Sequence, residues 1–429
     1  MRSAVLTFFL LATSYTVLAQ NNPPPSSSEP SVQALLERIQ QLEKRISDLE
    51  ARENNRENNK QATLQPRAAP PSEVTQTQPP PPVPPSPAGG EHDHLSNATV
   101  VREAEEHYPS LQIRGFGDVD FSASDQKGSV SGFNLGQFVL HFASPLSRKV
   151  SYFGEVSFTA QPASYELQVE RSIIRYDYND YFKISFGKYH TPIGYWNTAF
   201  HHGAWLQTTI SRPQMVQIGG TFIPVHFVGL LAEGNIPSGG LGLGYNVGLG
   251  NGRSSILSKA GDSGDVNDNG AWVATVFARP TRIYGVQLGA SVYRDKLTPQ
   301  AGQNFDETIT SAHLVYTKEH PEFLSEFANS HHREVLTGRT FNSQAFYVQL
   351  AYRLPWQGEK WKPYYRFEYI HKPESDPVFT GVSDLVGSTL GVRYDITNYA
   401  AFKGEYRSTR LGVGEPRSNA AFFQTAFTF

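Results

Sequence analysis

The sequence has 429 residues, with 37 Lys and Arg against 40 Asp and Glu, and it contains no cysteine. A nearly balanced charge gives no basis for binding nucleic acid, and a chain without cysteine cannot depend on disulfides. After the first twenty positions, no apolar run reaches the roughly 20 residues that a spanning helix needs, which excludes a helical membrane protein.

Residues 1–19 have the features of a secretory signal peptide. Arg2 precedes an apolar core from Ala4 to Leu11, and small residues lead to a cleavage site after Ala19. Residues 20–31 are mostly Asn, Pro and Ser, and we expect them to be disordered. The mature chain is thus predicted to be exported.

Residues 32–56 are predicted to form a short coiled coil. Apolar residues recur at alternating spacings of three and four, with β-branched residues at a and Leu at d. This arrangement alone favours two strands, but the charged residues around it resemble a signature of trimeric coiled coils. We therefore predict a homotrimer, with a lone surface helix or a partly disordered arm as the alternative. The residues expected to direct trimerisation are Arg38, Ile39, Leu42, Glu43, Arg45, Ile46, Leu49 and Glu50.

Residues 57–110 are rich in proline, including the run from Pro79 to Pro82. Such a segment is extended and semi-rigid, with a length of about 3 Å per residue. We interpret it as a linker between the coiled coil and the rest of the chain.

From residue 111 to residue 429 the pattern is that of β-strands. Ile113 and Val119 alternate with Arg114, Asp118 and Asp120, and the same period of two recurs along the chain. Short connectors, such as 145–149 and 319–321, alternate with longer or more polar ones at 124–131, 161–164, 190–221, 250–269, 295–306, 330–342, 372–384 and 409–418. About sixteen antiparallel strands of 9 to 11 residues, joined this way, predict an all-β transmembrane barrel in an outer membrane. A secreted soluble β-protein is the alternative.

The chain ends in the alternating run AAFFQTAFTF. Ala421, Phe423, Phe427 and Phe429 share one face, so we expect a final membrane strand that pairs with the first strand and closes the barrel. A final aromatic residue also resembles the signal that the barrel-assembly machinery recognises, and Phe429 is the predicted membrane-assembly signal.

This organisation resembles the Gram-negative trimeric outer-membrane porins. Residues 169–176 and 186–194 are similar to the central part of the phosphate-selective porin O and P superfamily, and residues 245–252 resemble a strand-to-loop step of these proteins. The resemblance implies a passive, trimeric channel whose third extracellular loop folds into the pore as its constriction. It does not give the solute.

The expected constriction, residues 190–221, contains one formal charge, Arg212, which is weak support for phosphate. The constriction candidates are Tyr195, Trp196, His201, His202, Trp205, Gln207, Arg212 and Gln214. Charges of both signs are expected on the lumenal face of the strands, at Arg114, Asp118, Asp120, Arg366, Glu368, Lys403, Glu405 and Arg407. Opposed charges across a pore would orient dipolar or zwitterionic solutes, whereas aromatic and amide groups at the constriction suit uncharged or sugar-like solutes. The alternative is that the lumenal charges only keep the lumen hydrated.

No residue pattern indicates a cofactor, a metal site or an enzyme. The pairs His201-His202 and His331-His332 lie in apparent loops without a second paired motif, and residues 262–269 lack the spaced Glu of a calcium loop.

The sequence therefore predicts an outer-membrane porin that passes small hydrophilic solutes or ions. Its expected partners are outer-membrane lipid, two further copies of itself and the barrel-assembly machinery, with peptidoglycan as a partner of the N-terminal arm. An even strand number places this arm in the periplasm. The alternatives are a plugged barrel that acts as a cell-envelope tether, or a surface-interaction protein whose loops bind a partner.

Overall fold

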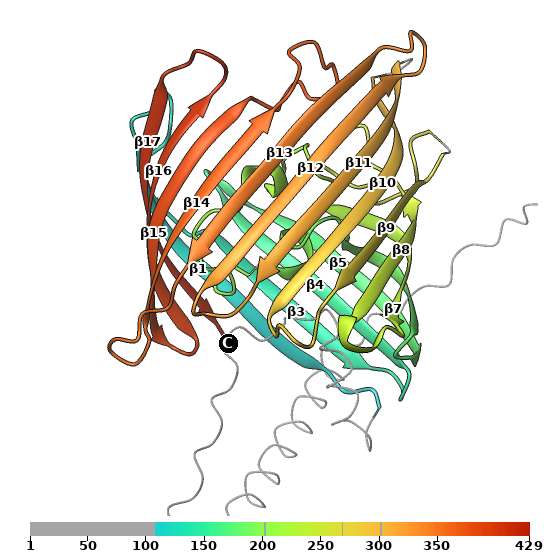
Figure 1. The fold of residues 1–429 in the computed structure, drawn as a ribbon, viewed down its shortest axis with the longest axis horizontal. Helices are drawn as coiled ribbons and strands as arrows, with labels where there is room; N and C mark the ends of the chain where they lie inside the picture. The colour runs from blue at the N-terminus through green and yellow to red at the C-terminus, as the bar shows by residue number, and fades with distance from the viewer. Residues whose placement is uncertain (1–107, 201–202, 268, 301–302) are drawn as a thin grey trace, which may run out of the picture. The chain divides into compact units, whose positions relative to one another are not determined.

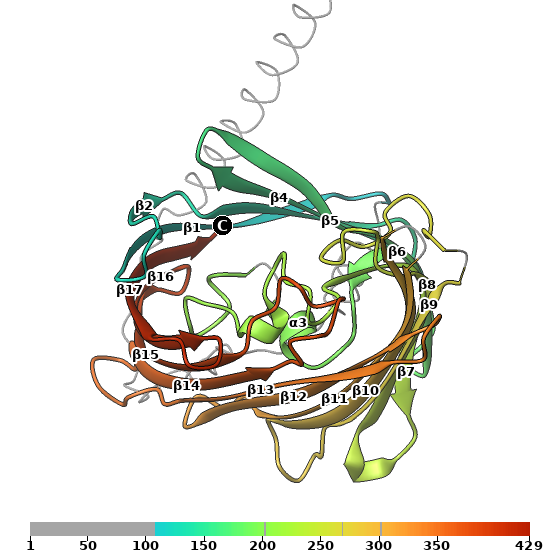
Figure 2. The same cartoon turned by 90° about the horizontal axis from the view of Figure 1, so that it is seen from above.

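The computed structural model describes residues 108–200, 203–267, 269–300 and 303–429. These residues form one antiparallel sheet that closes on itself (Figures 1 and 2). No helix in this part of the chain is long and apolar enough to cross a membrane. The predicted signal peptide, the eight trimerisation residues, most of the linker, and His201 and His202 lie outside the described residues.

The sheet has 17 labelled strands within the described residues. Because β2 and β3 both pair with β1 at successive positions, they are two pieces of one barrel strand, and the barrel has 16 strands. This confirms the predicted fold class. The strands are β1 (Gln112–Ser124), β2 (Gly132–Asn134), β3 (Gln137–Pro145), β4 (Val150–Gln161), β5 (Ser164–Asn179), β6 (Phe182–His190), β7 (His226–Ile236), β8 (Leu243–Asn251), β9 (Ala271–Ala278), β10 (Val286–Gln300), β11 (Gln303–Tyr316), β12 (Glu322–Glu334), β13 (Thr340–Ala351), β14 (Trp361–His371), β15 (Leu385–Thr397), β16 (Ala400–Leu411) and β17 (Arg417–Thr428).

Alternation along the strands separates an apolar outer face from an inner face that carries buried charges as well as apolar core residues. In β16, Phe402 and Tyr406 are each 52% exposed on the outside, while Lys403 and Glu405 between them are buried. Successive side chains of a strand point to opposite faces, so every second residue faces the lumen. The predicted alternation is confirmed.

The first and last strands close the barrel, as the sequence predicted. In the β1–β17 pairing, Phe116 lies opposite Thr428, and the backbone N–H of Gly115 donates to the carbonyl of Phe429 at 2.9 Å. The Phe429 ring lies over Gly115, where an added Cβ would approach it to 2.3 Å, and it stacks on Phe138 with 5.8 Å between ring centroids. Glycine in β1 therefore provides the space that the final aromatic ring occupies.

Three connectors predicted to be longer or more polar than the others are short. Only residues 162–163 separate β4 from β5, residues 335–339 separate β12 from β13, and β10 and β11 cover most of the predicted loop at 295–306. Polar residues are compatible with strands in these segments because they either face the lumen or lie at the ends of the strands, past the part of the outer face that is apolar. The longest connectors in the described chain are 191–225 and 252–270, and both leave the strands at the end of the barrel opposite to the last residue (Figure 1).

The buried core lies inside the barrel. It combines apolar side chains from residues 189–223 with others from the connectors 252–270 and 372–384 and from the lumenal faces of β7 and β9 to β15, including Trp196, Val216, Ile309, Leu324 and Tyr347. A barrel with a packed interior of this kind is partly filled by its own chain.

Candidate functional site

Residues 191–225, which join β6 to β7, fold into the barrel and are called the inserted segment below. Figure 2 shows this segment, with the short helix α3 (Trp196–Ala199), inside the ring of strands. Its two ends are held together because the N–H of Thr191 donates to the carbonyl of Val225 at 2.9 Å. The Asn197 amide donates to the carbonyl oxygens of both residues, at 2.8 and 3.1 Å.

The backbone of the inserted segment is bound by buried carboxylates. Glu326 of β12 accepts the N–H groups of Tyr195 and Trp196 at 2.8 and 2.7 Å. Glu405 of β16 accepts the N–H of Ile210 at 3.0 Å and the hydroxyl of Ser211 at 2.7 Å. Irregular backbone away from water needs such partners, and ionised acceptors give the stronger hydrogen bonds.

Buried cations bind carbonyl oxygens of the same segment. Arg366 of β14 donates to the carbonyl of Ser211 at 2.8 Å and to its hydroxyl at 2.6 Å. Lys403 of β16 donates to the carbonyl of Thr209 at 3.1 Å and to that of Ala204. The inserted segment is therefore fixed to the lumenal wall formed by β12, β14 and β16.

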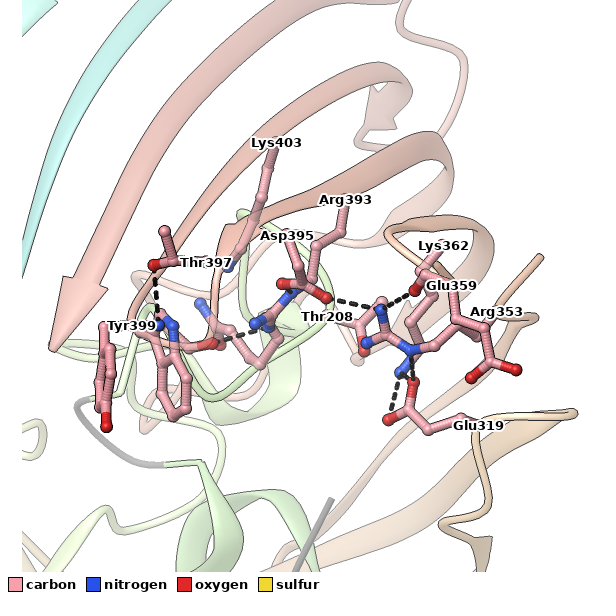
Figure 3. Close-up of polar contacts among 12 residues, drawn as sticks. Thr208, Glu319, Arg353, Glu359, Lys362, Arg393, Asp395, Thr397, Tyr399 and Lys403 are labelled. Carbon is pink, nitrogen blue, oxygen red and sulfur yellow. Dashed lines mark hydrogen bonds and ion pairs between the residues drawn. The ribbon is translucent and has the colours of Figure 1, made fainter. Parts of the chain in front are cut away.

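A chain of alternating charges runs along this wall from the short-turn end of the barrel (Figure 3). Arg353 lies between Glu319 and Asp395, with N···O distances of 2.7 and 2.5 Å. Asp395 also accepts from Arg393 at 2.7 Å, and Glu319 pairs with Lys362 at 3.0 Å. Each charge thus has a neighbour of the opposite sign.

Both ends of this charge chain contact the inserted segment. Arg393 donates to the carbonyl oxygens of Trp205 and Gln207 at 2.7 and 3.1 Å. Glu322, which pairs with Lys362 at 2.6 Å, accepts the hydroxyl of Thr208 at 2.9 Å. The charge chain therefore fixes residues 205–208 to the barrel wall.

The connector at 372–384 closes over the other side of the inserted segment. Phe379 is fully buried and stacks on Phe222, with 5.3 Å between ring centroids. Asp376 lies 2.8 Å from Nδ1 of His332, whose Nε2 lies 3.0 Å from Glu307. Burial opposes ionisation of Asp376, but its hydrogen bond to His332 and those from the Val378 and Phe379 backbone hold its pKa below the ordinary value.

The constriction candidates from the sequence lie in this segment but differ in exposure. Trp196 is fully buried, with its ring edge-on to Tyr347, so it packs in the core and does not line a passage. Gln207 is also buried, whereas Tyr195, Trp205 and Gln214 are half-buried. The sequence does not reveal which side of an irregular segment faces the wall.

Arg212 is the only formal charge of the inserted segment, and it is buried. Burial lowers its pKa to about 10, although the carboxylates of Glu170 and Glu326 oppose this shift. It therefore remains protonated at neutral pH. Glu170 belongs to β5 and Glu326 to β12, so carboxylates from two different parts of the barrel wall stabilise the charge of Arg212.

The eight lumenal candidates occupy two environments. Arg366, Glu368, Lys403 and Glu405 are buried against the inserted segment; Glu368 accepts the N–H of Gln214 at 2.7 Å. The remaining four retain different degrees of contact with solvent: Arg114 is exposed, Asp118 is 9% exposed, and Asp120 and Arg407 are half-buried.

Sequence reasoning missed the lumenal residues of β3, β4 and β5. His141, Glu155 and Arg171 lie side by side on these strands, with Glu155 2.9 Å from His141 and 2.5 Å from Arg171. Each occupies a polar position within an alternating strand, which is the signal that could have identified it.

The described residues contain no cluster of three or more His, Asp or Glu side chains arranged to hold a metal ion. His331 and His332, predicted to lie in a loop, belong to β12. Alternation along the strand separates them, so His331 contacts Asn342 and His332 faces Glu307 inside the barrel.

No protein-family model matches the sequence, and no curated protein matches it. Similar solved structures include an anion-selective porin from Comamonas acidovorans, with 10% identity and a TM-score of 0.55 over 75% of this chain and 100% of that one. The outer membrane channel DcaP of Acinetobacter baumannii (12% identity, TM-score 0.52) and OmpF of Salmonella typhi (12%, 0.52) each cover 75% of this chain, matching 97% and 98% of their own. At these identities, the comparisons show that the chain has the fold of the 16-stranded porins.

Proposed function

We propose that the protein is a porin of the Gram-negative outer membrane and provides a passive path for small hydrophilic solutes or ions. The observation that carries this proposal is the inserted segment, which is fixed by buried charges to one wall of a barrel whose outer face is apolar. A protein with an apolar exterior and a charged interior suits a lipid environment outside and water inside.

The outer face supports membrane insertion. Large apolar side chains on β14 to β17 are exposed to the outside, including Tyr365 at 45% and Phe423 at 57%. In a closed barrel every strand is paired on both sides, so the backbone hydrogen bonds that lipid cannot provide are satisfied.

The interior supports a channel that is narrowed and not completely plugged. The inserted segment binds β12, β14 and β16 through many buried contacts, whereas lumenal cations of β1, β5 and β16 keep solvent-exposed surface, as Arg114, Arg171 and Arg407 do. We infer that the path for solutes follows these cations. A tether function, which needs no path, has no comparable support.

The finer assignments rest on the sequence. We propose a homotrimer joined by the coiled coil at 32–56, with the arm in the periplasm because 16 strands place both ends of the barrel on the same side. Contact of this arm with peptidoglycan, and recognition of Phe429 by the barrel-assembly machinery, belong to the same proposal. So does membership of the phosphate-selective porin O and P superfamily, which does not by itself assign the solute.

Swelling of proteoliposomes tests the proposed function. Vesicles containing the full chain, shown to be folded by its β-sheet circular dichroism and its heat-dependent migration in SDS gels, are diluted into isotonic solutions of small sugars or amino acids. The proposal predicts swelling at rates that fall as solute size increases. Vesicles with folded protein that swell no faster than empty ones would contradict it and favour the tether.

A further inference from the structure

Three contacts between a carboxylate and a basic side chain on the lumenal wall share an unequal exposure. The Arg171 side chain is 12% exposed and its partner Glu155 is 1% exposed, while Arg407 is 22% exposed and Glu405 is fully buried. His141, also paired with Glu155, is 21% exposed. In each pair the carboxylate is covered and the basic group contacts the solvent of the lumen.

The same basic groups lie on aromatic rings. The guanidinium carbon of Arg171 is 4.4 Å from the centroid of the Phe153 ring, and that of Arg407 is 3.9 Å from the Phe422 ring. His141 lies edge-on to both Phe116 and Phe153, at 5.0 and 5.3 Å. Phe116, His141, Phe153 and Arg171, from β1, β3, β4 and β5, therefore form a continuous band that we call the aromatic–arginine row.

Arg114 adds a further cation to this row. Its Cα is paired with that of His141, which is in turn paired with that of Glu155, so all three lie in one row across neighbouring strands. Arg114 is exposed. On β1, the acidic Asp118 and Asp120 are instead within the electrostatic influence of the buried Lys403.

The inserted segment does not offset these cations. Residues 191–225 contain no Asp or Glu, and their single formal charge, Arg212, is buried. Apolar side chains such as Phe200, Leu206 and Ile218 are half-buried. The described part of the segment, 191–200 and 203–225, therefore offers apolar surface but no accessible formal charge to the lumen.

We propose that the channel prefers small aromatic carboxylates among the solutes that it passes. This inference rests on the proposed function and names its substrate class. A carboxylate would exchange its hydration for the guanidinium edge of Arg171 or, farther along the lumen, for that of Arg407. A planar body would stack on the rings beneath them, Phe153 and Phe422. Cations would be disfavoured at both positions, and aliphatic carboxylates would lack the stacking contact.

The short-turn end of the barrel does not share this arrangement. At the short-turn end the order of exposure reverses, since Asp177 is 25% exposed and its partner Arg175 only 5% exposed. Asp395 is likewise more exposed than Arg353, at 21% against 11%. Selectivity is therefore expected to respond to substitutions in the aromatic–arginine row and at Arg407, and not to the overall charge of the lumen.

Reversal potentials of the full-length protein in planar bilayers test this inference. Gradients of sodium benzoate and sodium acetate give the permeability of each anion relative to sodium, and a gradient of benzylammonium chloride tests an aromatic cation. The wild type should prefer benzoate to acetate and exclude benzylammonium. The variants Arg171→Gln and Arg407→Gln should lower both anion permeabilities, whereas Phe153→Leu should reduce the benzoate-to-acetate ratio by about threefold with little effect on acetate.

Arg410→Gln is the matched control, because Arg410 lies on β16 three residues beyond Arg407 and on its outer face. This variant should behave as the wild type. An open channel with equal permeability to benzoate and acetate, or with cation preference, would overturn the substrate class and leave the porin function intact. A folded protein without conductance would overturn both. If Arg171→Gln does not fold, Phe153→Leu and Arg407→Gln still decide the result.

Discussion

Glu326 accepts the backbone N–H of Trp196 at 2.7 Å, which joins the inserted segment to a strand 130 residues later in the chain. The same carboxylate accepts the N–H of Tyr195 and the hydroxyl of Tyr347. One buried side chain thus satisfies three donors and determines where the segment lies in the lumen.

Replacing Glu326 by Ala should release the first part of the inserted segment. Each buried donor left without an acceptor costs about 1 to 3 kcal/mol, so the loss should be visible as a lower urea midpoint of unfolding in detergent and as a noisier current. Glu326→Gln keeps an acceptor of similar size and should have a smaller effect. Equal stability of all three proteins would show that this contact does not hold the segment.

Gly194 gives a second test of the same contact. Its φ is +72°, and an added Cβ would lie 1.9 Å from Oε2 of Glu326. We expect Gly194→Ala to displace the segment from β12 and to change the single-channel conductance.

Gly219 provides the control for this change. It lies in the same segment and has the same φ of +72°, but an added Cβ would meet nothing within 4 Å. Both variants carry the backbone strain of a left-handed alanine, about 1 to 2 kcal/mol, but only Gly194→Ala adds the collision. Identical conductance and stability in the two variants would exclude the collision as a cause.

The Phe429 ring is predicted to matter for insertion more than for permeation. Phe429→Ala keeps the backbone pairing with Gly115 but removes the ring that stacks on Phe138. Its amount in isolated outer membranes should be several-fold lower than that of the wild type, with unchanged ion selectivity in the molecules that insert. Phe423→Ala, which removes another exposed outer ring of β17, is the comparison. Equal membrane levels of these two variants would argue against a special role of the last residue.

The contact of Asp376 with His332 should depend on pH. The pKa of Asp376 in the folded protein lies below its value in an unfolded chain, so its carboxylate stabilises the 372–384 connector above the unfolded pKa of about 4. This contribution is lost as the pH falls through the lower folded pKa. Hydrogen-exchange protection within 372–384, corrected for the intrinsic exchange rate at each pH, should fall at acidic pH, and Asp376→Asn should show the lower protection already at neutral pH. Protection that is independent of pH in the wild type would contradict this reading.

Trimer formation through the N-terminal helix stays a prediction from the sequence. Asn in place of Ile39 and Ile46 puts polar groups at two a positions and should weaken the association of a peptide spanning 28–60. Sedimentation equilibrium measures this directly, and unchanged association of the double variant would show that the heptad assignment is wrong.

Strand alternation made most of the barrel predictable from the sequence. Phe402 and Tyr406 face outward and Lys403 and Glu405 face inward, as their spacing indicated, and the final aromatic run pairs with the first strand. These features depend on a period of two that a single sequence displays.

The interior was less predictable because its contacts join distant residues without periodicity. Nothing near Trp196 in the sequence indicates that its ring would be buried edge-on against Tyr347, or that Glu326 would accept its backbone N–H. His332 was assigned to a loop because polar residues inside a barrel resemble those of a loop until their partners, here Glu307 and Asp376, are known. Glu155 and Arg171 were not identified as lumenal residues for the same reason.

Single-channel recording of the purified full-length protein in a planar bilayer tests the central claim most directly. An open, trimeric porin predicts stable conductance that closes in three equal steps at high voltage, with a larger unit conductance after Gly194→Ala and no such increase after Gly219→Ala. A verified folded barrel that gives no conductance in either form would contradict the channel function.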